Sequence, residues 1–156
     1  MSNFAGIQTD EVINGEGLGM TIYFQGCSHH CKGCHNPETW EFGVGKYTDF
    51  EIYGIIYEYF RNTPFAERLT FSGGDPLDNP EDTWKLIAYM REFNPEIKLW
   101  LYTGYVYDEL PEGKKLLCEM CDVVVDGPFI LEQRDITLPF RGSTNQRILR
   151  MNDDTV

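Results

Sequence analysis

The spacing of hydrophobic and polar residues predicts strands and helices in alternation along most of the chain. Four short runs of β-branched and aromatic residues predict buried strands, at Met20–Phe24, Leu69–Phe71, Ile97–Tyr102 and Val123–Val125. Between these runs, apolar residues recur at three- and four-residue intervals, which predicts helices. The helices are expected to run from Thr48 to near Pro64, from Asn79 to before Pro95, and from Lys114 to Met120.

The first two predicted helices carry clear local signals. Thr48 and Glu51 have the spacing of a capping box, and Pro80 stands at the first position of the second helix. The apolar residues at helical spacing in the first helix are expected to be core, namely Phe50, Tyr53, Ile56, Tyr57 and Phe60. In the second helix the expected buried stripe consists of Leu86, Ile87, Met90 and Phe93.

This alternation predicts an α/β fold with parallel strands joined by right-handed crossovers. Parallel strands place their carboxyl ends at one edge, where the loops after them meet. The 156 residues fit a single domain, 1–156, but a full eight-unit barrel needs about 200 residues or more. We therefore expect an open partial (β/α) barrel of four to six mostly parallel strands.

Three cysteines follow the first predicted strand at the spacing C-x3-C-x2-C, as Cys27, Cys31 and Cys34. Three thiols suit a metal centre with one open coordination position, because a closed structural site normally takes four protein ligands. Zinc bound by these cysteines and a nearby histidine (His29, His30 or His35) is the alternative. A disulfide framework is not expected, since five cysteines is an odd number and no N-terminal apolar segment resembles a signal peptide.

The cysteine motif resembles that of the radical S-adenosylmethionine (SAM) enzymes, in which three such cysteines hold a [4Fe-4S] cluster and SAM chelates the remaining iron. The stretches His35–Trp40 and Arg141–Arg147 resemble the glycyl-radical-enzyme activases within that family. The resemblance implies a partial barrel of the radical SAM type. It also implies that the metal ligands and catalytic residues are Cys27, Cys31 and Cys34.

Further residues are expected to bind SAM. The resemblance places the strand-end stretch Gly73, Gly74 and Asp75 where the family binds the amino group of SAM. A side chain at position 74 is therefore expected to weaken SAM binding and to leave the cluster intact. The cofactor-binding residues expected beside the cluster are Gly33, Cys34 and His35, although the family usually carries an aromatic residue where this chain has Gly33.

Two more strand ends carry candidates for polar contacts to SAM. Thr103 and Asp126 follow the third and fourth predicted strands, so they are expected at the same edge of the sheet. Their alternative roles are a strand-end hydroxyl and an aspartate that begins a turn before Gly127.

The resemblance implies that the protein cleaves SAM reductively to methionine and a 5′-deoxyadenosyl radical, which removes a hydrogen atom from a glycine of a partner. The implied partner is the large subunit of anaerobic ribonucleoside-triphosphate reductase, with an electron donor such as a flavodoxin. The alternatives are an activase of the pyruvate formate-lyase type, a radical SAM enzyme acting on a small molecule, and a non-catalytic zinc-binding adaptor.

Charge and hydropathy limit the partners. The 13 basic and 25 acidic residues give a net charge of −12, which argues against nucleic acid and anionic membranes as partners. No apolar run approaches the roughly 20 residues of a membrane span, and a cytoplasmic protein is expected.

Two clusters of residues remain outside the predicted cysteine site. Four arginines between Arg134 and Arg150 suggest a docking surface. The alternative is an internal role, in which one of them, above all Arg141, pairs with a carboxylate on the strand face or contacts SAM itself. Cys118 and Cys121 form a second C-x2-C pair, which is expected to be structural because it lies on an apolar helix end.

Overall fold

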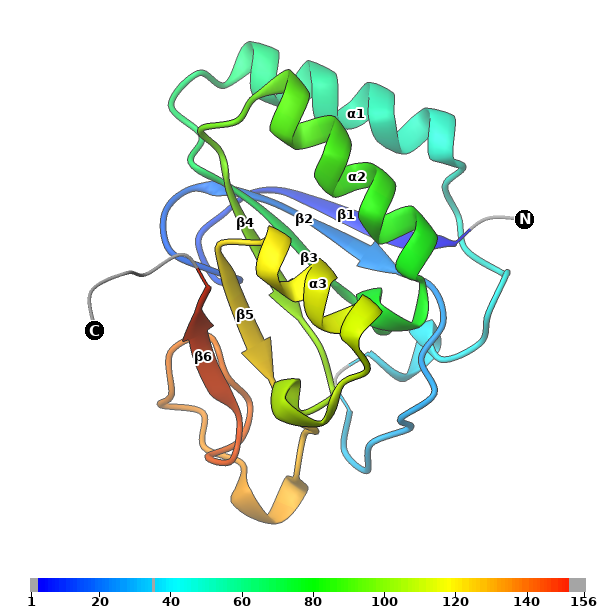
Figure 1. The fold of residues 1–156 in the computed structure, drawn as a ribbon, viewed down its shortest axis with the longest axis vertical. Coiled ribbons are helices and arrows are strands. Elements are labelled where there is room, and N and C mark those ends of the chain that lie inside the picture. The colour runs from blue at the N-terminus through cyan, green and yellow to red at the C-terminus, as the bar shows by residue number, and fades with distance from the viewer. Residues whose placement is uncertain (1–2, 35, 152–156) are drawn as a thin grey trace.

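A computed structural model of the chain describes residues 3–34 and 36–151. Within these residues, six strands form one sheet in the order β1-β2-β3-β4-β5-β6 (Figure 1). The strands are β1 (Phe4–Glu11), β2 (Gly19–Phe24), β3 (Arg68–Gly73), β4 (Lys98–Tyr102), β5 (Val123–Asp126) and β6 (Arg147–Arg150). The helices are α1 (Asp49–Asn62), α2 (Pro80–Phe93) and α3 (Glu112–Met120). No helix in this part of the chain combines the length and apolar character of a membrane span.

The four central strands confirm the predicted parallel arrangement. β2 pairs with β3, β3 with β4 and β4 with β5, all in parallel. β1 and β6 flank them as antiparallel neighbours of β2 and β5. The α/β class and the mostly parallel direction therefore agree with the prediction, whereas neither antiparallel strand was predicted.

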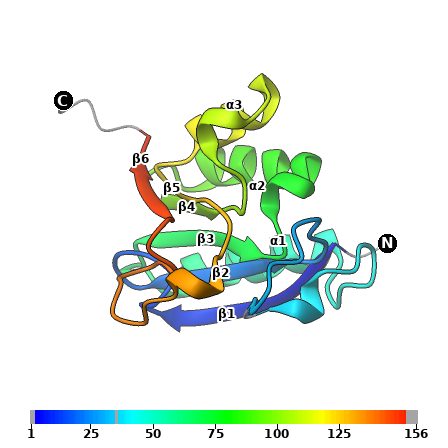
Figure 2. The same ribbon diagram turned by 90° about the horizontal axis from the view of Figure 1, so that it is seen from below.

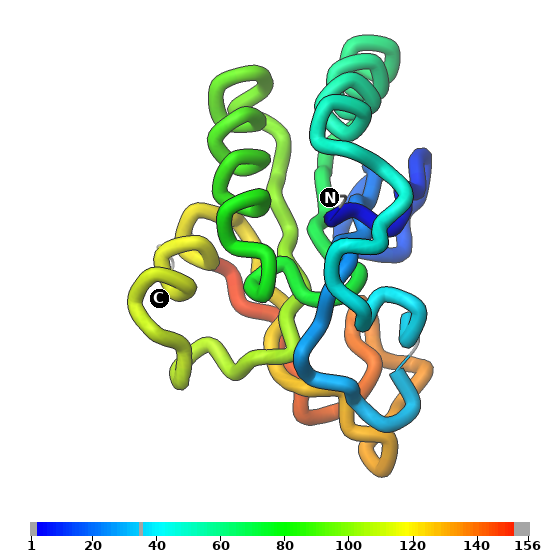
Figure 3. The backbone as a smooth tube through the Cα atoms, turned by 90° about the vertical axis from the view of Figure 1, so that its right-hand side faces the viewer, coloured from blue at the N-terminus to red at the C-terminus, as the bar shows by residue number. Residues whose placement is uncertain are grey.

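Side chains of the central strands alternate between two different faces. Ile22, Phe71, Leu99 and Val124 point into the main hydrophobic core, which also takes in the buried sides of the helices. Trp100, Val123 and Val125 form a second cluster on the opposite face, with Phe140 against it. α1 and α2 stand side by side over the first face (Figures 1 and 3). The opposite face is covered by loops and carries polar side chains beside this smaller apolar cluster.

Helix α1 begins as predicted, but part of its predicted core is wrong. The Thr48 hydroxyl accepts a hydrogen bond from Glu51 N at 3.3 Å, and Glu51 Oε1 accepts one from Thr48 N at 3.1 Å, which completes the capping box. Phe50 is 89% exposed and Tyr57 is 41% exposed, so neither belongs to the core. The buried stripe of α1 consists of Ile52, Ile56, Tyr59 and Phe60, whose spacing places them on the face toward the sheet.

A buried ion pair anchors β1 and the loop after it to the polar face of the sheet. The guanidinium of Arg68, which is fully buried, donates to both carboxylate oxygens of Glu11, at 2.9 Å and 2.8 Å. The same carboxylate accepts hydrogen bonds from Thr21 and from the backbone of Ile13 and Asn14. Burial raises the pKa of Glu11, but these hydrogen bonds outweigh it and the pKa lies below its usual value.

Removal of the negative charge in Glu11→Gln is expected to lower the free energy of unfolding by about 3–5 kcal/mol, because Arg68 would remain charged and buried without its partner. Urea denaturation followed by circular dichroism measures this loss. Glu16→Gln is the control, since Glu16 pairs with Arg150 at 2.7 Å and both side chains are about half exposed. Its expected loss is below about 1 kcal/mol, and equal losses in the two variants would contradict the role of the buried pair.

Candidate active site

The loops after β2, β3, β4 and β5 meet around one cavity of about 400 Å³, as parallel strands require. Seen from below, the segment after β5 passes in front of β2 (Figure 2). Residues that line the cavity from these loops include Cys27, Cys31, Cys34, Gly73, Gly74, Thr103 and Gly127. The structure thus brings the three cysteines together with the glycine pair. His35 lies outside the described residues.

Backbone hydrogen bonds fix the start of the cysteine loop. Gly26 N donates to Thr39 O at 2.6 Å, and Cys27 N donates to Trp40 O at 3.1 Å. Gly26 has a φ of +115°, and a Cβ there would lie 2.3 Å from the Phe42 ring, so a side chain would not fit. The stretch after the motif therefore folds back against its beginning and holds Cys27 in place.

The three thiols and their neighbours offer ligands for a metal centre. Among the described residues, one group of three metal-binding side chains has its ligand atoms within 4.8 Å of one another, and its members are Cys27, His29 and Asp78. Cys31 and Cys34 line the same cavity as Cys27. A structural zinc ion normally takes four protein ligands, whereas each cysteine of a cluster binds its own iron, so three cysteines suffice for a cluster.

The residues present therefore fit an iron-sulfur cluster. Cys27 is buried and Cys31 and Cys34 are half-buried, and all three face the same cavity. Burial raises the pKa of the Cys27 thiol to about 11. A metal binds cysteine as the thiolate, so metal binding at Cys27 would release the proton of this thiol.

Asp75 joins the cysteine loop to the ends of β3 and β4. Its carboxylate is fully buried and accepts hydrogen bonds from Leu77 N at 2.9 Å, Gly104 N at 2.9 Å and the Thr103 hydroxyl at 3.0 Å. Nε2 of His29 lies 2.6 Å from the same carboxylate, and this hydrogen bond is the main reason that the pKa of His29 is raised. Asp75 does not line the cavity, whereas Thr103 does. Their roles in SAM binding stay predictions.

The glycine pair packs against the cysteine loop itself. A Cβ at Gly74 would lie 2.3 Å from Gly26 O and 3.0 Å from Thr39 O. Gly74 N donates to Phe24 O at 2.8 Å, and Asp75 N donates to Gly26 O at 2.9 Å. The expectation that a side chain at position 74 would leave the cluster intact therefore does not fit the structure, because the side chain would displace the loop that carries the cysteines.

Asp126 is not among the residues that line the cavity and is bound by an arginine. Its two carboxylate oxygens accept hydrogen bonds from Arg147, at 3.0 Å from Nε and 2.6 Å from Nη2. Tyr107 N donates to the same carboxylate at 2.8 Å. The predicted contact of Asp126 with SAM remains a prediction, and the adjacent Gly127 is the residue that lines the cavity.

The segment from Pro128 to Gln146, here called the closing segment, forms a wall of the cavity, and sequence reasoning considered a contact with the ligand only for its Arg141. Its residues that line the cavity are Phe129, Leu138, Phe140, Arg141, Gly142 and Gln146. A Cβ at Gly33 would lie 2.9 Å from Leu131 Cδ1 and 3.2 Å from Phe129 Cε2. The space that a side chain at position 33 would need is thus filled from this segment. The motif Arg141–Arg147 was the signal that could have pointed to this segment. The sequence did not show, however, that the segment lies against the cavity.

Two of the four arginines between Arg134 and Arg150 are engaged in ion pairs. Arg147 lies 2.6 Å from Asp126 and 3.1 Å from Asp108, and Arg150 lies 2.7 Å from Glu16. Arg141 donates a hydrogen bond to Gln146 O at 3.2 Å. The internal role considered for these arginines therefore applies at least to Arg147.

Cys118 and Cys121 belong to the core. Both are fully buried free thiols within the main hydrophobic cluster. Burial raises the pKa of Cys118 to about 12 and raises that of Cys121 as well. The structural role expected for this pair agrees with their position.

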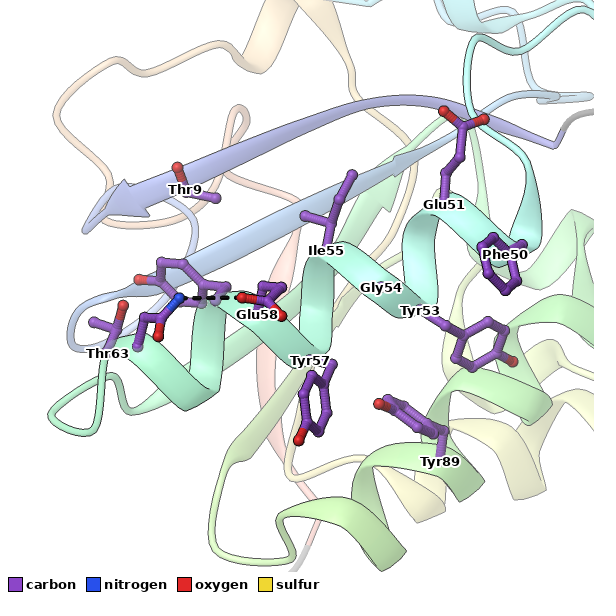
Figure 4. A pocket seen from close by; sticks show the side chains of 12 residues that line it. Thr9, Phe50, Glu51, Tyr53, Gly54, Ile55, Tyr57, Glu58, Thr63 and Tyr89 are labelled. Atoms are coloured by element: carbon purple, nitrogen blue, oxygen red, sulfur yellow. Dashed lines mark hydrogen bonds between the residues drawn. The ribbon is translucent and has the colours of Figure 1, made fainter.

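A second and larger hollow, of about 920 Å³, lies along α1 and shares no lining residue with the cysteine cavity. Phe50, Tyr53 and Tyr57 of α1 line it together with Tyr89 of α2 (Figure 4). The rings of Tyr53 and Tyr89 are 4.9 Å apart. It contains none of the predicted metal-binding residues.

Known proteins match this chain over nearly its full length. The family model of the 4Fe-4S single cluster domain matches residues 13–149. The chain is 38% identical to the anaerobic ribonucleoside-triphosphate reductase-activating protein of Haemophilus influenzae, over 95% of this chain and 97% of that protein. The chain belongs to this family of activating proteins. Those of Vibrio cholerae (38% identical; 90% and 92% covered) and Escherichia coli K12 (34%; 87% and 90%) are similar as well.

Each of the substitutions Cys27→Ala, Cys31→Ala and Cys34→Ala is expected to lower the bound iron and sulfide several-fold after anaerobic reconstitution, because an activating protein of this family would lose one of three ligands. Cys118→Ala and Cys121→Ala are the controls and are expected to keep the iron of the parent. Iron and sulfide analysis gives the result. Parental iron content in a variant of the first group would remove that thiol from the metal site.

Gly74→Ala is expected to lower the iron content and the melting temperature together, because its Cβ would collide with Gly26 O in the cysteine loop. Gly113→Ala is the matched control, since a Cβ at Gly113 meets no atom within 4 Å. Iron analysis and thermal unfolding of both variants check the expectation. Full iron content in Gly74→Ala would show that the loop tolerates the side chain.

Proposed function

We propose that this protein generates the glycyl radical of anaerobic ribonucleoside-triphosphate reductase by reductive cleavage of SAM. A bound [4Fe-4S] cluster would supply one electron to the sulfonium of SAM, which separates into methionine and a 5′-deoxyadenosyl radical. The radical would then take a hydrogen atom from a glycine of the reductase, leaving 5′-deoxyadenosine and a glycyl radical. The names and 4Fe-4S domain of the relatives support this proposal.

The observation that carries the proposal is the cavity into which three cysteines and the glycine pair converge. Cys27, Cys31 and Cys34 would hold the cluster and leave one iron free for SAM. Gly73 and Gly74 would bring backbone close to the amino group of SAM, and Thr103 would offer a hydroxyl. Asp75 would act indirectly, by holding His29 and Thr103 in place, because its carboxylate is hydrogen-bonded to both.

An open partial barrel of the radical SAM type is part of the proposal. Among the described strands, β1 and β6 end the sheet and are not paired with each other. A closed barrel would keep a protein substrate out, whereas an open side would admit a loop of the reductase that carries the glycine.

The proposed partners are the large subunit of the reductase and an electron donor such as a flavodoxin, in the cytoplasm. The net charge of −12 gives no attraction to nucleic acid or to an anionic membrane surface. An activase of the pyruvate formate-lyase type is less favoured, because the relatives are named for the ribonucleotide reductase. A zinc-binding adaptor is less favoured, because the family model that matches the chain is that of a 4Fe-4S domain.

Anaerobic reconstitution with iron and sulfide, followed by incubation with SAM, a reductant and the reductase large subunit, tests the function. The expected result is an electron paramagnetic resonance doublet of a glycyl radical and one 5′-deoxyadenosine per radical. The Cys31→Ala variant serves as the control and is expected to give neither. Reconstituted protein that binds a full cluster but forms neither product would contradict the proposed function.

A further inference from the structure

The cavity that holds the cysteines has an unusual charge for this protein. Although the chain carries 25 acidic and 13 basic residues, no aspartate or glutamate is among the described residues that line the cavity. Arg141 is the one arginine or lysine among them. Apart from the cysteines, His29 and Tyr102, the one ionisable side chain among the described residues that line this cavity is therefore a cation, in contrast to the acidic protein around it.

The guanidinium of Arg141 has unused binding capacity. Within the described part of the chain, no carboxylate oxygen lies within 4.0 Å of it, whereas Arg68, Arg91, Arg147 and Arg150 each have such a partner. Its Nε atom is buried and makes no hydrogen bond. The charge of Arg141 contributes to the lowered pKa of Asp135, after the hydrogen bonds from Thr137, but the two form no ion pair. A half-buried cation without a carboxylate in contact loses hydration that an anionic ligand can replace.

Hydrogen bonds of the closing segment hold Arg141 at the cavity. Oε1 of Gln146 accepts from Gly142 N at 2.8 Å and from Ser143 N at 3.2 Å, and Nε2 of Gln146 donates to Gly127 O at 3.0 Å. Ile130 N donates to the buried Ser143 hydroxyl at 3.2 Å. The backbone around Arg141 is thereby fixed to the end of β5, so little ordering remains for a ligand to induce.

We propose that Arg141 binds the carboxylate of the methionine part of SAM, an inference that rests on the proposed function. SAM carries a carboxylate, an amino group and a sulfonium, and of these groups only the carboxylate is an anion. Arg141 reaches the cavity from the closing segment, whereas the glycine pair reaches it from β3. Arg141 is thus a positioning residue that orients the amino-acid end of SAM beside the cysteines.

Binding of two ligands to the reconstituted protein tests this assignment. SAM and its decarboxylated analogue differ in the carboxylate alone, and equilibrium dialysis under anaerobic conditions measures both affinities. Arg141→Gln is expected to weaken SAM binding about tenfold or more and to leave the affinity for the analogue unchanged. Arg141→Lys keeps the charge but loses the forked geometry. Its affinity for SAM is expected to lie between that of the parent and that of Arg141→Gln.

Arg134→Gln is the matched control, because Arg134 is an exposed residue of the same segment and does not line the cavity. It is expected to change neither affinity, and iron content shows that each variant has kept its cluster. The assignment would be overturned if both Arg141 variants lost equal affinity for SAM and for the analogue, or if neither variant lost any affinity. In either case, SAM binding by the parent would still uphold the proposed function. A fully loaded parent that does not bind SAM would overturn both.

Discussion

The site depends on one buried carboxylate. Asp75 has no exposed surface, and four hydrogen-bond partners from three segments converge on it. A buried carboxylate without partners would be costly, so each partner is held where the carboxylate requires it. Through His29 this requirement reaches the cysteine loop, and through Thr103 and Gly104 it reaches the end of β4. The relative position of these loops is therefore set by the hydrogen bonds of one buried carboxyl group.

One face of the sheet contributes mainly to stability, and the other face carries the site. The face toward the helices is apolar and supplies the main core. The opposite face carries the Arg68–Glu11 pair at its start and the cavity at its end. Because parallel strands are covered on both faces, this polar face needs the loop after β1 and the closing segment to shield it. The edge strands β1 and β6 are the parts of the sheet that bring these two covers into place.

Local patterns were sufficient for the central elements and insufficient for contacts between distant parts. The capping box at Thr48, the apolar strand cores and the meeting of the strand ends all follow from rules within a few residues or from parallel topology. Residues 147–150 form a strand only because β5 offers an unpaired edge, which their sequence does not reveal. Phe50 and Tyr57 share the helical spacing of core residues, but the orientation of α1 on the sheet leaves them outside.

Within the site, too, the residue types could be predicted from the sequence, whereas contacts between distant segments could not. The types and spacing of Cys27, Cys31 and Cys34 pointed to a metal centre, since ligand chemistry is a property of the residues themselves. The engagement of Asp126 by Arg147 depends on where β6 lies, and no local pattern contains that information. The packing of Gly74 against Gly26 is a main-chain contact across two strands, which sequence reasoning replaced by a contact with ligand.

The closing segment also has a consequence for the order in which the site is made. The cysteines are synthesised early, whereas Arg141 and Gln146 are among the last residues of the cavity to be synthesised, and a domain folds as a unit. Until the closing segment is available, the chain that carries the thiols cannot complete the cavity. Iron and sulfide delivered to the nascent chain would meet an open site, whereas delivery to the finished protein must pass through the mouth of a completed cavity.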